Sequence, residues 1–370
     1  MYPSLDGAAL RATDGAVAES VIAARPHTLM TSGRAAIARA LAAYGIGGDD
    51  EVLVPAYCCL AMTAPIKARG AQPVYYSMRD DLTIDLGRLQ DFVTERTRAV
   101  IAVHYFGAAT PLLALRSWCD ARDLMLLEDC AHAFYTASGP ELVGGVGHAG
   151  IASIMKFLPT CDGGALWFNV AGSDTLSAVA PRATTLREIL SLVERSRLPA
   201  AGLIRLAAKA RSGVKRRVDA VAARPANASQ SADGEFDFVP QTEHLAASGS
   251  TRWLLRRDSA ARIKQRRRAH FEYLAHQLQS IGGVRLFWPT LPAGAIPYVL
   301  PCLFERGDEA FRILRARGVQ VFRWEFTEQH GCETTRRYAR SLLQLPVHQS
   351  LQSAELDIMV DAIRAAAAAS

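Results

Sequence analysis

The sequence predicts an α/β protein. It has a large domain with a mostly parallel central sheet flanked by helices, followed by a smaller C-terminal α+β domain. In the first half of the chain, short apolar runs alternate with helical segments, a pattern typical of parallel sheets with right-handed crossovers. The chain has 370 residues and is 50% hydrophobic, which is enough for more than one core.

The elements of the first half follow from its turn residues. Residues 1–30 are expected to form an N-terminal arm. An alanine-rich helix over 33–45 ends at Gly45, since glycine commonly terminates helices. Strands are expected at 52–54, 73–76, 99–104 and 124–127, with two more around a glycine turn in 150–170, and helices at 59–69, 86–94 and 111–122. Ligands bind beyond the carboxyl ends of such strands, so the residues there are the first candidates for a site.

The second half predicts the smaller domain. A helical stretch is expected at 184–222, a polar loop at 226–235, one long helix at 252–281, strands at 298–304 and 319–323, and helices at 308–317 and 353–368. The predicted division is an arm at 1–30, a large domain at 31–250 whose part 176–250 is variable, and a small domain at 251–370.

Composition restricts the class of protein. Charged residues make up 21% of the chain, so global disorder is not expected. The formal charge of +6 comes partly from arginine clusters at 205–217 and 252–268. Such clusters can bind nucleic acid or an anionic membrane, but here they fit a phosphorylated substrate as well and solvated helix faces better. We therefore expect no nucleic-acid partner.

The cysteines and the N-terminus indicate a cytoplasmic protein. The seven cysteines are odd in number and none has C-x-x-C spacing, so neither a zinc site nor a disulfide framework is expected. The N-terminus has no basic segment followed by an apolar run, so no secretory signal is predicted. No uncharged stretch reaches the roughly 18 apolar residues that a membrane span needs.

One lysine suggests a chemistry. Lys156 follows Ser153 by three residues and precedes the Gly163-Gly164 pair. A lysine amine can form a Schiff base with an aldehyde cofactor, and glycines let the backbone approach a flat ring closely. Alone, such a lysine is usually a surface residue. We interpret Lys156 as catalytic because of the residues that accompany it.

An acidic pair ends the strand that precedes this lysine. Glu128-Asp129 is followed by His132. A buried carboxylate can keep the pyridine nitrogen of pyridoxal 5'-phosphate (PLP) protonated, so that the ring withdraws electrons from a substrate carbanion. Asp129 is the candidate for this role, although the pair could also cap a helix or be solvated. His132 could pack on the cofactor, hold Asp129 by a hydrogen bond, or be a structural histidine.

Three further segments lie where a cofactor would be held. Ser32 and Gly33 open the first helix just before Arg34, and a helix start with free N–H groups suits a phosphate as well as simple capping. Residues 55–59, with Tyr57, Cys58 and Cys59, follow a strand end and could place a side chain against a flat ring. Residues 104–107 close another strand and are expected to pack around the same pocket.

In this order, these residues resemble the DegT/DnrJ/EryC1/StrS aminotransferase family, the sugar-aminotransferase-like branch of fold-type-I PLP-dependent enzymes. The resemblance covers residues 30–170 well and 283–365 weakly. Its stretches are S-G-R-A-A-I, G-I-G-G-D-D-E-V-L-V-P-A-Y, A-V-H-Y-F-G, L-E-D-C-A-H-A, K-F-L-P-T-C-D-G-G-A and L-P-V-H-Q-S-L.

The resemblance implies a PLP-dependent aminotransferase fold and a homodimer with active sites at the interface. An amino group would move from a donor amino acid, glutamate by expectation, to the keto group of a sugar nucleotide or another biosynthetic intermediate. Lys156 would bond to the cofactor and Asp129 would pair with its pyridine nitrogen. Ser32, Gly33, Arg34 and Ser153 would lie near the phosphate, and His132 near the ring. A bulky aromatic is common in the family where Cys59 falls, so ring stacking is expected to shift to Tyr57.

Two other hypotheses stay open. Cys58, Cys59 and Cys161 motivate a different PLP reaction of the lyase or desulfurase type. The arginine-rich 205–217 stretch motivates a non-catalytic regulator, for which salt-dependent binding to DNA or anionic vesicles would be the sign.

Overall fold

A mixed seven-stranded sheet forms the centre of the protein. The computed structural model describes residues 2–11, 15–23, 25–137, 143–170, 179–194, 196–197, 238–324, 327 and 332–368. The sheet order is β1-β7-β6-β5-β4-β2-β3. Its strands are β1 (Thr28–Met30), β2 (Glu51–Pro55), β3 (Gln72–Tyr76), β4 (Thr97–Val103), β5 (Met125–Asp129), β6 (Ala149–Ser153) and β7 (Gly164–Phe168). Strands β2 to β6 run parallel, while β7 and β1 are antiparallel to their neighbours.

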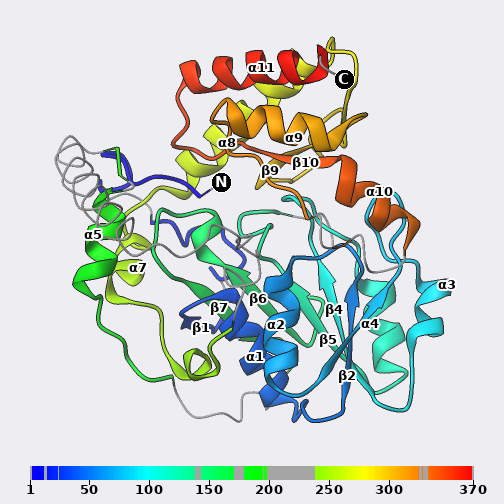
Figure 1. The fold of residues 1–370 in the computed structure, drawn as a ribbon. Helices are drawn as coiled ribbons and strands as arrows, with labels where there is room; N and C mark the ends of the chain where they lie inside the picture. The colour runs from blue at the N-terminus through cyan, green and yellow to red at the C-terminus, as the bar shows by residue number, and fades with distance from the viewer. Residues whose placement is uncertain are drawn as a thin grey trace, which may run out of the picture.

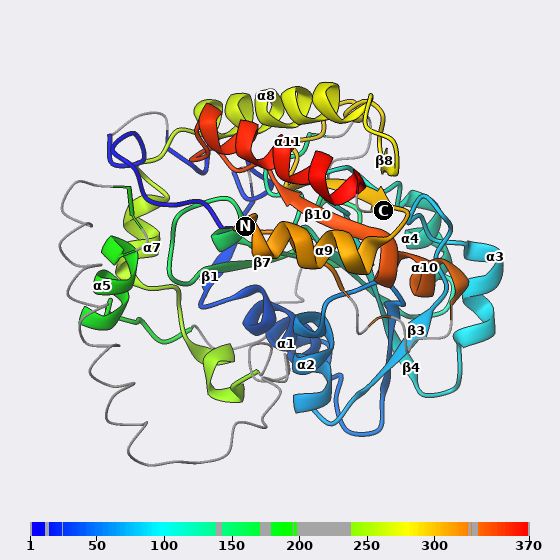
Figure 2. The ribbon, with the colours of Figure 1, turned by 45° about the horizontal axis from the view of Figure 1, so that its top comes forward.

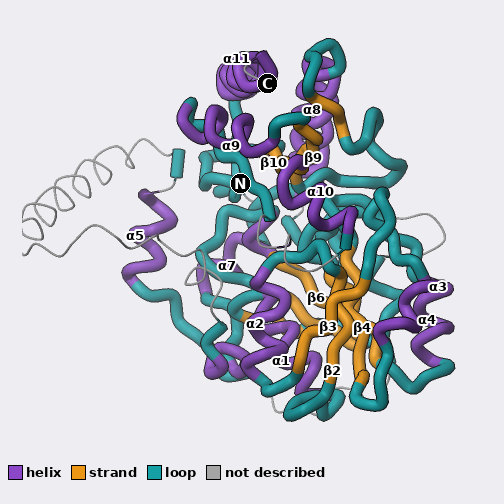
Figure 3. Tube along the Cα trace, turned by 45° about the vertical axis from the view of Figure 1, so that its right-hand side comes forward, coloured by secondary structure: helices purple, strands orange, loops and turns teal. Residues whose placement is uncertain are grey.

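Helices cover both faces of this sheet (Figure 3). On one face lie α1 (Gly33–Ala43) and α2 (Leu60–Ala68). On the other lie α3 (Leu86–Leu89), its short continuation η1 (Gln90–Phe92), and α4 (Leu113–Asp120). Strands β4 and β5 are buried almost throughout, as expected for parallel strands with helices on both sides. The predicted mostly parallel sheet flanked by helices is confirmed.

A second, smaller unit lies above the seven-stranded sheet in Figure 1. Its three-stranded antiparallel sheet has the order β10-β9-β8. The elements are α8 (Ala260–Leu278), β8 (Val284–Leu286), β9 (Val299–Phe304), α9 (Gly307–Ala316), α10 (Glu333–Ser341), β10 (Leu342–Pro346) and α11 (Ser353–Ala368). Helix α11 lies beside α8 and α9 (Figure 2), and together they enclose a core that includes Leu274, Leu300 and Ile363. The exact bounds of the predicted domains stay a prediction.

Several elements of the second half differ from the prediction. Instead of one helix at 252–281, the chain forms α7 (Gly249–Leu254) and then α8. The break occurs because Ser259 adopts an extended conformation and its hydroxyl accepts from the Arg262 N–H, which starts a new helix. The predicted strand at 319–323 is reduced to a bridge between Phe322 and Gln344, because β10 pairs along its length with β9.

Other differences concern short elements. Strands β1, β8 and β10 and helix α10 were not predicted, and neither was the 3-10 turn η4 (Pro240–His244). Of the predicted helical stretch at 184–222, the structure describes α5 (Leu186–Glu194). The arginine cluster at 205–217 and the polar segment at 226–235 lie outside the described residues. Among the helices in the described ranges, none is both long and apolar enough to cross a membrane.

Candidate active site

A cleft of about 160 Å³ lies at the carboxyl ends of the parallel strands, where α/β sheets bind ligands. Seven of the nine predicted site residues line it, although they come from four separate parts of the chain. These are Ser32, Gly33, Arg34, Cys59, Asp129, Ser153 and Lys156. The structure therefore brings together most of the predicted set.

Asp129 is a buried carboxylate at the end of β5, 7% exposed. Its Oδ1 accepts from the Ala131 N–H at 2.8 Å, which fixes the side chain. Burial raises the pKa of Asp129, and the nearby Lys156 ammonium and the Ala131 amide offset this only in part. A carboxylate in this position is stabilised by a further positive charge, so the cleft favours a cationic ligand beside Asp129.

Lys156 lies in the single turn η2 (Ile154–Lys156), directly after β6. Its Nζ lies 5.3 Å from the ring centroid of Tyr298, within the range of a cation–π contact. The turn is closed by Phe157 and Leu158, whose N–H groups both donate to the Ile154 carbonyl. A strand end and a closed turn together hold the lysine at the cleft.

The N-terminus of α1 forms another wall of the cleft. The Ser32 hydroxyl caps the helix by accepting from the Ala35 N–H at 3.2 Å. This helix end reaches β7 because Gly164 has no side chain: a Cβ there would lie 2.3 Å from the Ser32 carbonyl carbon. Helix N-termini attract anions through their first-turn N–H groups and dipole, and Arg34 adds a cation.

The loop after Lys156 is fixed by Asp162. The Asp162 carboxylate accepts from the Ser248 N–H at 2.9 Å, the Ser248 hydroxyl at 2.7 Å and Arg182 Nη1 at 2.8 Å. It also accepts from the Thr251 hydroxyl. Gly163 follows with a φ of +132°, a conformation that side chains disfavour. The Asp-Gly-Gly segment therefore holds the chain between the lysine turn and β7.

Tyr57 does not line the cleft, so the expected shift of ring stacking to this residue is not seen. Its ring is fully buried and packs against Trp324, with centroids 4.8 Å apart. The Tyr57 carbonyl accepts from the Tyr105 hydroxyl, which fixes the backbone so that the ring faces the second unit. Cys59, which precedes α2, is the residue of this segment that reaches the cleft.

His132 lies behind the cleft in a cluster of aromatic rings. It stacks on Tyr298, with centroids 4.5 Å apart, and its Nδ1 accepts from the Phe106 N–H at 3.3 Å. Burial, and secondarily the Lys156 charge, hold the pKa of His132 well below its ordinary value, so the ring is neutral. Of the roles left open, these contacts favour the structural one.

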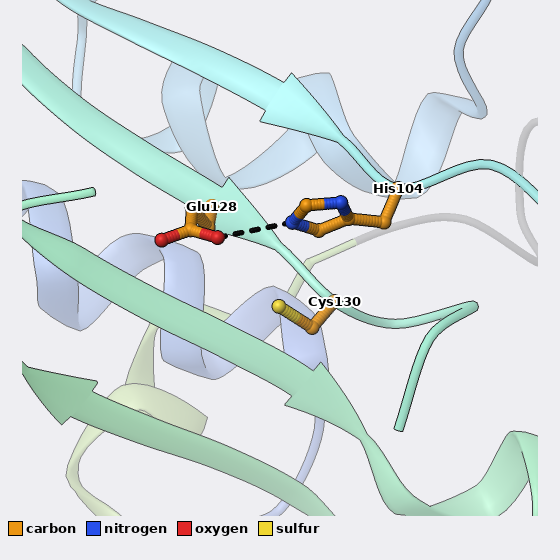
Figure 4. A group of neighbouring side chains, drawn as sticks. All are labelled: His104, Glu128 and Cys130. Carbon is orange, nitrogen blue, oxygen red and sulfur yellow. Dashed lines mark hydrogen bonds and ion pairs between the residues drawn. The ribbon is translucent and has the colours of Figure 1, made fainter. Parts of the chain in front are cut away.

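His104 does not face the cleft, contrary to expectation, but forms a buried cluster with Glu128 and Cys130 (Figure 4). Side chains alternate along a strand, so Glu128 and Cys130 lie on the side opposite to Asp129. The Thr110 N–H donates to His104 Nδ1, and Nε2 donates to Glu128 at 3.0 Å. Glu128 also accepts the N–H groups of Gly144, Val146 and Gly147. Because the His104 nitrogens and the Glu128 oxygens are already paired, we interpret the cluster as structural, not as a metal site.

Replacing Glu128 should destabilise the protein. An amide at this position cannot accept every hydrogen bond that the carboxylate accepts, so we expect Glu128→Gln to cost about 2–4 kcal/mol in the free energy of unfolding at neutral pH. Burial would raise the pKa of Glu128, but His104 and the Gly147 and Gly144 amides together lower it below its ordinary value. The carboxylate therefore stabilises the fold above that ordinary value, and the contribution is lost as the pH falls through the lowered pKa.

Urea unfolding at stepwise lower pH measures this effect. The gap between the wild type and Glu128→Gln should be largest at neutral pH and shrink on acidification. Glu272→Gln is the matched control, because the Glu272 side chain on α8 is 62% exposed. If the two variants unfold alike, the interpretation of Glu128 is wrong.

The cleft also contains residues that sequence reasoning missed. Tyr2 of the N-terminal arm lies at its edge, and Met155 and Met62 contribute apolar surface. Nothing in the sequence around Tyr2 indicates a site, because its position depends on the arm folding back over the large sheet. Met155 could have been inferred from its position beside Lys156.

Comparison with known proteins finds a similarity to the same family over less than half of the chain. Residues 11–177 match the model of the DegT/DnrJ/EryC1/StrS aminotransferase family. The L-glutamine:2-deoxy-scyllo-inosose aminotransferase of Streptomyces paromomycinus is 36% identical over 138 residues, which are 36% of this chain and 32% of the relative. GDP-perosamine synthase of Vibrio cholerae is 33% identical over 152 residues, 40% of this chain and 41% of the relative. The matched regions thus span well under half of these relatives.

Solved structures share the fold over nearly the whole chain. The aminotransferase TlmJ from Streptoalloteichus hindustanus has a TM-score of 0.64 and 24% identity, covering 93% of this chain and 86% of its own. Helicobacter pylori PseC, an aminotransferase involved in the biosynthesis of pseudoaminic acid, has a TM-score of 0.67 and 16% identity, covering 100% and 98%. The TM-scores show a common fold, and at identities this low the likeness shows the fold alone. Residues 11–177 of this chain therefore resemble the DegT/DnrJ/EryC1/StrS aminotransferase family, and the fold that it shares with solved aminotransferases extends over nearly the whole chain.

Proposed function

We propose that this protein is a PLP-dependent aminotransferase. It would move an amino group from an amino-acid donor to a keto group of a sugar nucleotide or a related cyclic intermediate. The observation that carries the proposal is the convergence of Lys156, Asp129 and the N-terminus of α1 on one cleft. An amine, a buried carboxylate and an anion-binding helix end are the three partners that an aldehyde, a pyridine nitrogen and a phosphate need.

The residues present fit this cofactor. Asp129 has one oxygen bound to the Ala131 N–H and a raised pKa, so it would gain from a protonated pyridine nitrogen. Ser32, Gly33 and Arg34 at the helix end, with Ser153 opposite, would hold the phosphate. When bound, PLP supplies an aldehyde that carries the amino group and a ring that accepts electrons.

The residues of the chain would supply the proton transfers and the positioning. Lys156 would bond to the cofactor at rest and, once displaced by the donor's amine, would move a proton from the donor Cα. Asp129 would keep its charge next to the pyridine nitrogen. His132, neutral and stacked on Tyr298, would support the wall behind the cleft without exchanging protons.

The donor is proposed to be glutamine or glutamate. The relative from Streptomyces paromomycinus is named for L-glutamine, whereas the sequence alone suggested glutamate. The same name and that of GDP-perosamine synthase refer to cyclic, hydroxyl-rich compounds. An acceptor of this class, a keto sugar or keto cyclitol, is therefore proposed for this chain.

A half-reaction tests the proposal without knowledge of the acceptor. Ping-pong chemistry releases the donor's oxo acid before the acceptor binds. PLP-loaded protein mixed with either donor alone should release a stoichiometric amount of that oxo acid, detected by mass spectrometry. The assignment of a selective aminotransferase would be contradicted if neither glutamine nor glutamate released its oxo acid. Equal release from many unrelated amino acids would contradict it as well.

We further propose a cytoplasmic homodimer with the cleft at the interface, as the family resemblance implies. Sedimentation at several protein concentrations measures this association. Mixing two inactive chains tests whether the subunits share the site. One chain carries Lys156→Ala, and the other keeps Lys156 but lacks a residue that it would supply to its partner's cleft. Heterodimers of the two would then regain activity.

The alternative reactions have less support in the structure. Of the three cysteines that motivated desulfurase chemistry, only Cys59 lines the cleft. Cys58 is buried, and the Cys161 thiol donates to the Glu188 carbonyl. Burial raises the pKa of Cys59 even though Lys156 opposes this, which disfavours a reactive thiolate. The arginine cluster that motivated a regulator lies outside the described residues.

A further inference from the structure

Arg267 is a fully buried arginine that binds four neutral acceptors. It lies on α8, in the second unit, with 0% exposure. Its Nε donates to Gln349 Oε1 at 3.0 Å, and Nη1 donates to the carbonyls of Pro297 and Tyr298 at 3.1 and 3.2 Å. Its Nη2 donates to the Lys156 carbonyl at 2.8 Å. A buried side chain of α8 therefore reaches the backbone of the lysine turn.

Gln349 makes a second connection to the same turn. It is 2% exposed and lies just after β10. While its Oε1 accepts from Arg267, its Nε2 donates to the Phe157 carbonyl at 2.7 Å. The guanidinium also lies 4.4 Å from the ring centroid of Phe157. The carbonyls of two consecutive residues are thus bound by two side chains that also bind each other.

These carbonyls are the ones that a short turn leaves without a partner. In a helical turn the last C=O groups have no intrahelical donor, and burying them unpaired costs about 1–3 kcal/mol each. Arg267 and Gln349 supply those donors from the second unit. Burial lowers the pKa of Arg267 to about 10. The guanidinium therefore stays charged at neutral pH, and all its N–H groups remain hydrogen-bond donors.

We propose that Arg267 and Gln349 are positioning residues for Lys156, forming a latch that fixes the lysine turn from the second unit. The functional part of this inference rests on the proposed aminotransferase activity. The latch binds only backbone, so it fixes where the Lys156 side chain starts without occupying the cleft. Neither residue is among those that line the cleft, and both act through Lys156.

The test compares four variants. Gln349→Met removes the donor to Phe157 and the acceptor for Arg267 while keeping the volume. Arg267→Lys keeps the charge but loses the forked geometry, and Arg267→Met removes the charge. Arg266→Met is the matched control: Arg266 is the neighbouring residue of α8 and donates to the Leu351 carbonyl at 2.7 Å, so it makes a similar bond elsewhere.

Hydrogen exchange of the cofactor-free protein is the first measurement. Loss of the latch should speed amide exchange in residues 154–160 by about 10-fold or more, while the β4 and β5 amides change little. Gln349→Met and Arg267→Lys should show this local effect, and Arg266→Met should not. Should Arg267→Met fail to fold, the first two variants still decide the question.

Kinetics of the PLP-loaded protein is the second measurement. A misplacement of about 1 Å can cost about 100-fold in rate, so Gln349→Met should lower kcat by about 10- to 100-fold. The affinity for PLP should change little, since the helix end of α1 is untouched. The KM for the donor should also change little, because neither residue lines the cleft. Arg267→Lys should fall between Gln349→Met and the wild type.

Three results would overturn the latch. They are wild-type exchange in Gln349→Met, exchange that rises equally in β4 and β5, or a kcat loss that Arg266→Met matches. Failure of the proposed function would look different. The wild type would then not bind PLP at all, while exchange in the cofactor-free protein would still report whether the two residues hold the turn.

Discussion

Lys156→Ala should lower kcat for amino transfer by about 10³-fold or more, because the variant loses both the covalent attachment and the proton carrier, and general acid–base catalysis alone contributes about 10²–10⁴-fold. The KM for the donor should change much less, since the other residues that line the cleft remain. Steady-state kinetics with glutamine and glutamate measure both constants.

Partial rescue separates this role from a structural one. A small primary amine in solution should restore part of the rate to Lys156→Ala, because it can take over the proton transfer in a cleft that the alanine has enlarged. Lys67→Ala is the control, since Lys67 is exposed on α2. A Lys156→Ala protein that transaminates at the wild-type rate would refute the mechanism.

Asp129→Asn should lower kcat by about 10²–10³-fold, the cost typical of removing one preorganised electrostatic partner of the transition state. An amide carries no charge to keep the pyridine nitrogen protonated, so the ring would withdraw electrons poorly. The Ala131 N–H can still donate to the remaining oxygen, so the geometry of the loop should be kept. Kinetics with the donor half-reaction isolate this effect from acceptor binding.

The same substitution should raise the stability of the cofactor-free protein at neutral pH. Burial raises the pKa of Asp129, so the ionised carboxylate is a cost to the folded state above that raised value. The cost disappears as the pH falls below the ordinary pKa of the group, and the two proteins should then unfold alike. Asp91→Asn, at an exposed position, is the control. A stability loss in Asp129→Asn at neutral pH would contradict this account of the carboxylate.

Much of the cleft could be predicted because its residues lie at the ends of strands that the local sequence pattern predicts. Asp129 lies at the end of an apolar strand, and Lys156 lies between a strand and a glycine pair. Each position follows from where a strand stops. The order of the parallel strands then places those ends together, so seven of the nine predicted residues meet in one cleft.

Tyr57 shows where this reasoning fails. The sequence places it after β2, but the direction of its ring depends on the Tyr105 hydroxyl that binds its carbonyl and on Trp324 from the far end of the chain. A residue just beyond a strand no longer follows the alternation of the strand. Which of Tyr57 and Cys59 faces the cleft is therefore a tertiary result.

Arg267 shows a second limit. It lies between Arg266 and Arg268 in a helix whose arginines were expected to be solvated. Arg268 is 40% exposed at its side chain, while Arg267 is fully buried. Successive helical residues point about 100° apart, but identical residue types give no signal of which one faces inward. Its partners come from residues 156, 297, 298 and 349, which only the folded chain brings together.

The role of Lys156 is tested most directly by identifying the residue that bonds to PLP. Wild-type protein loaded with PLP would be reduced with borohydride, digested and analysed by mass spectrometry. We expect a single phosphopyridoxyl adduct on the peptide that contains Lys156, and none when Lys156 is replaced by alanine. An adduct at Lys67 or Lys264 instead, or no adduct at saturating PLP, would refute the role of Lys156.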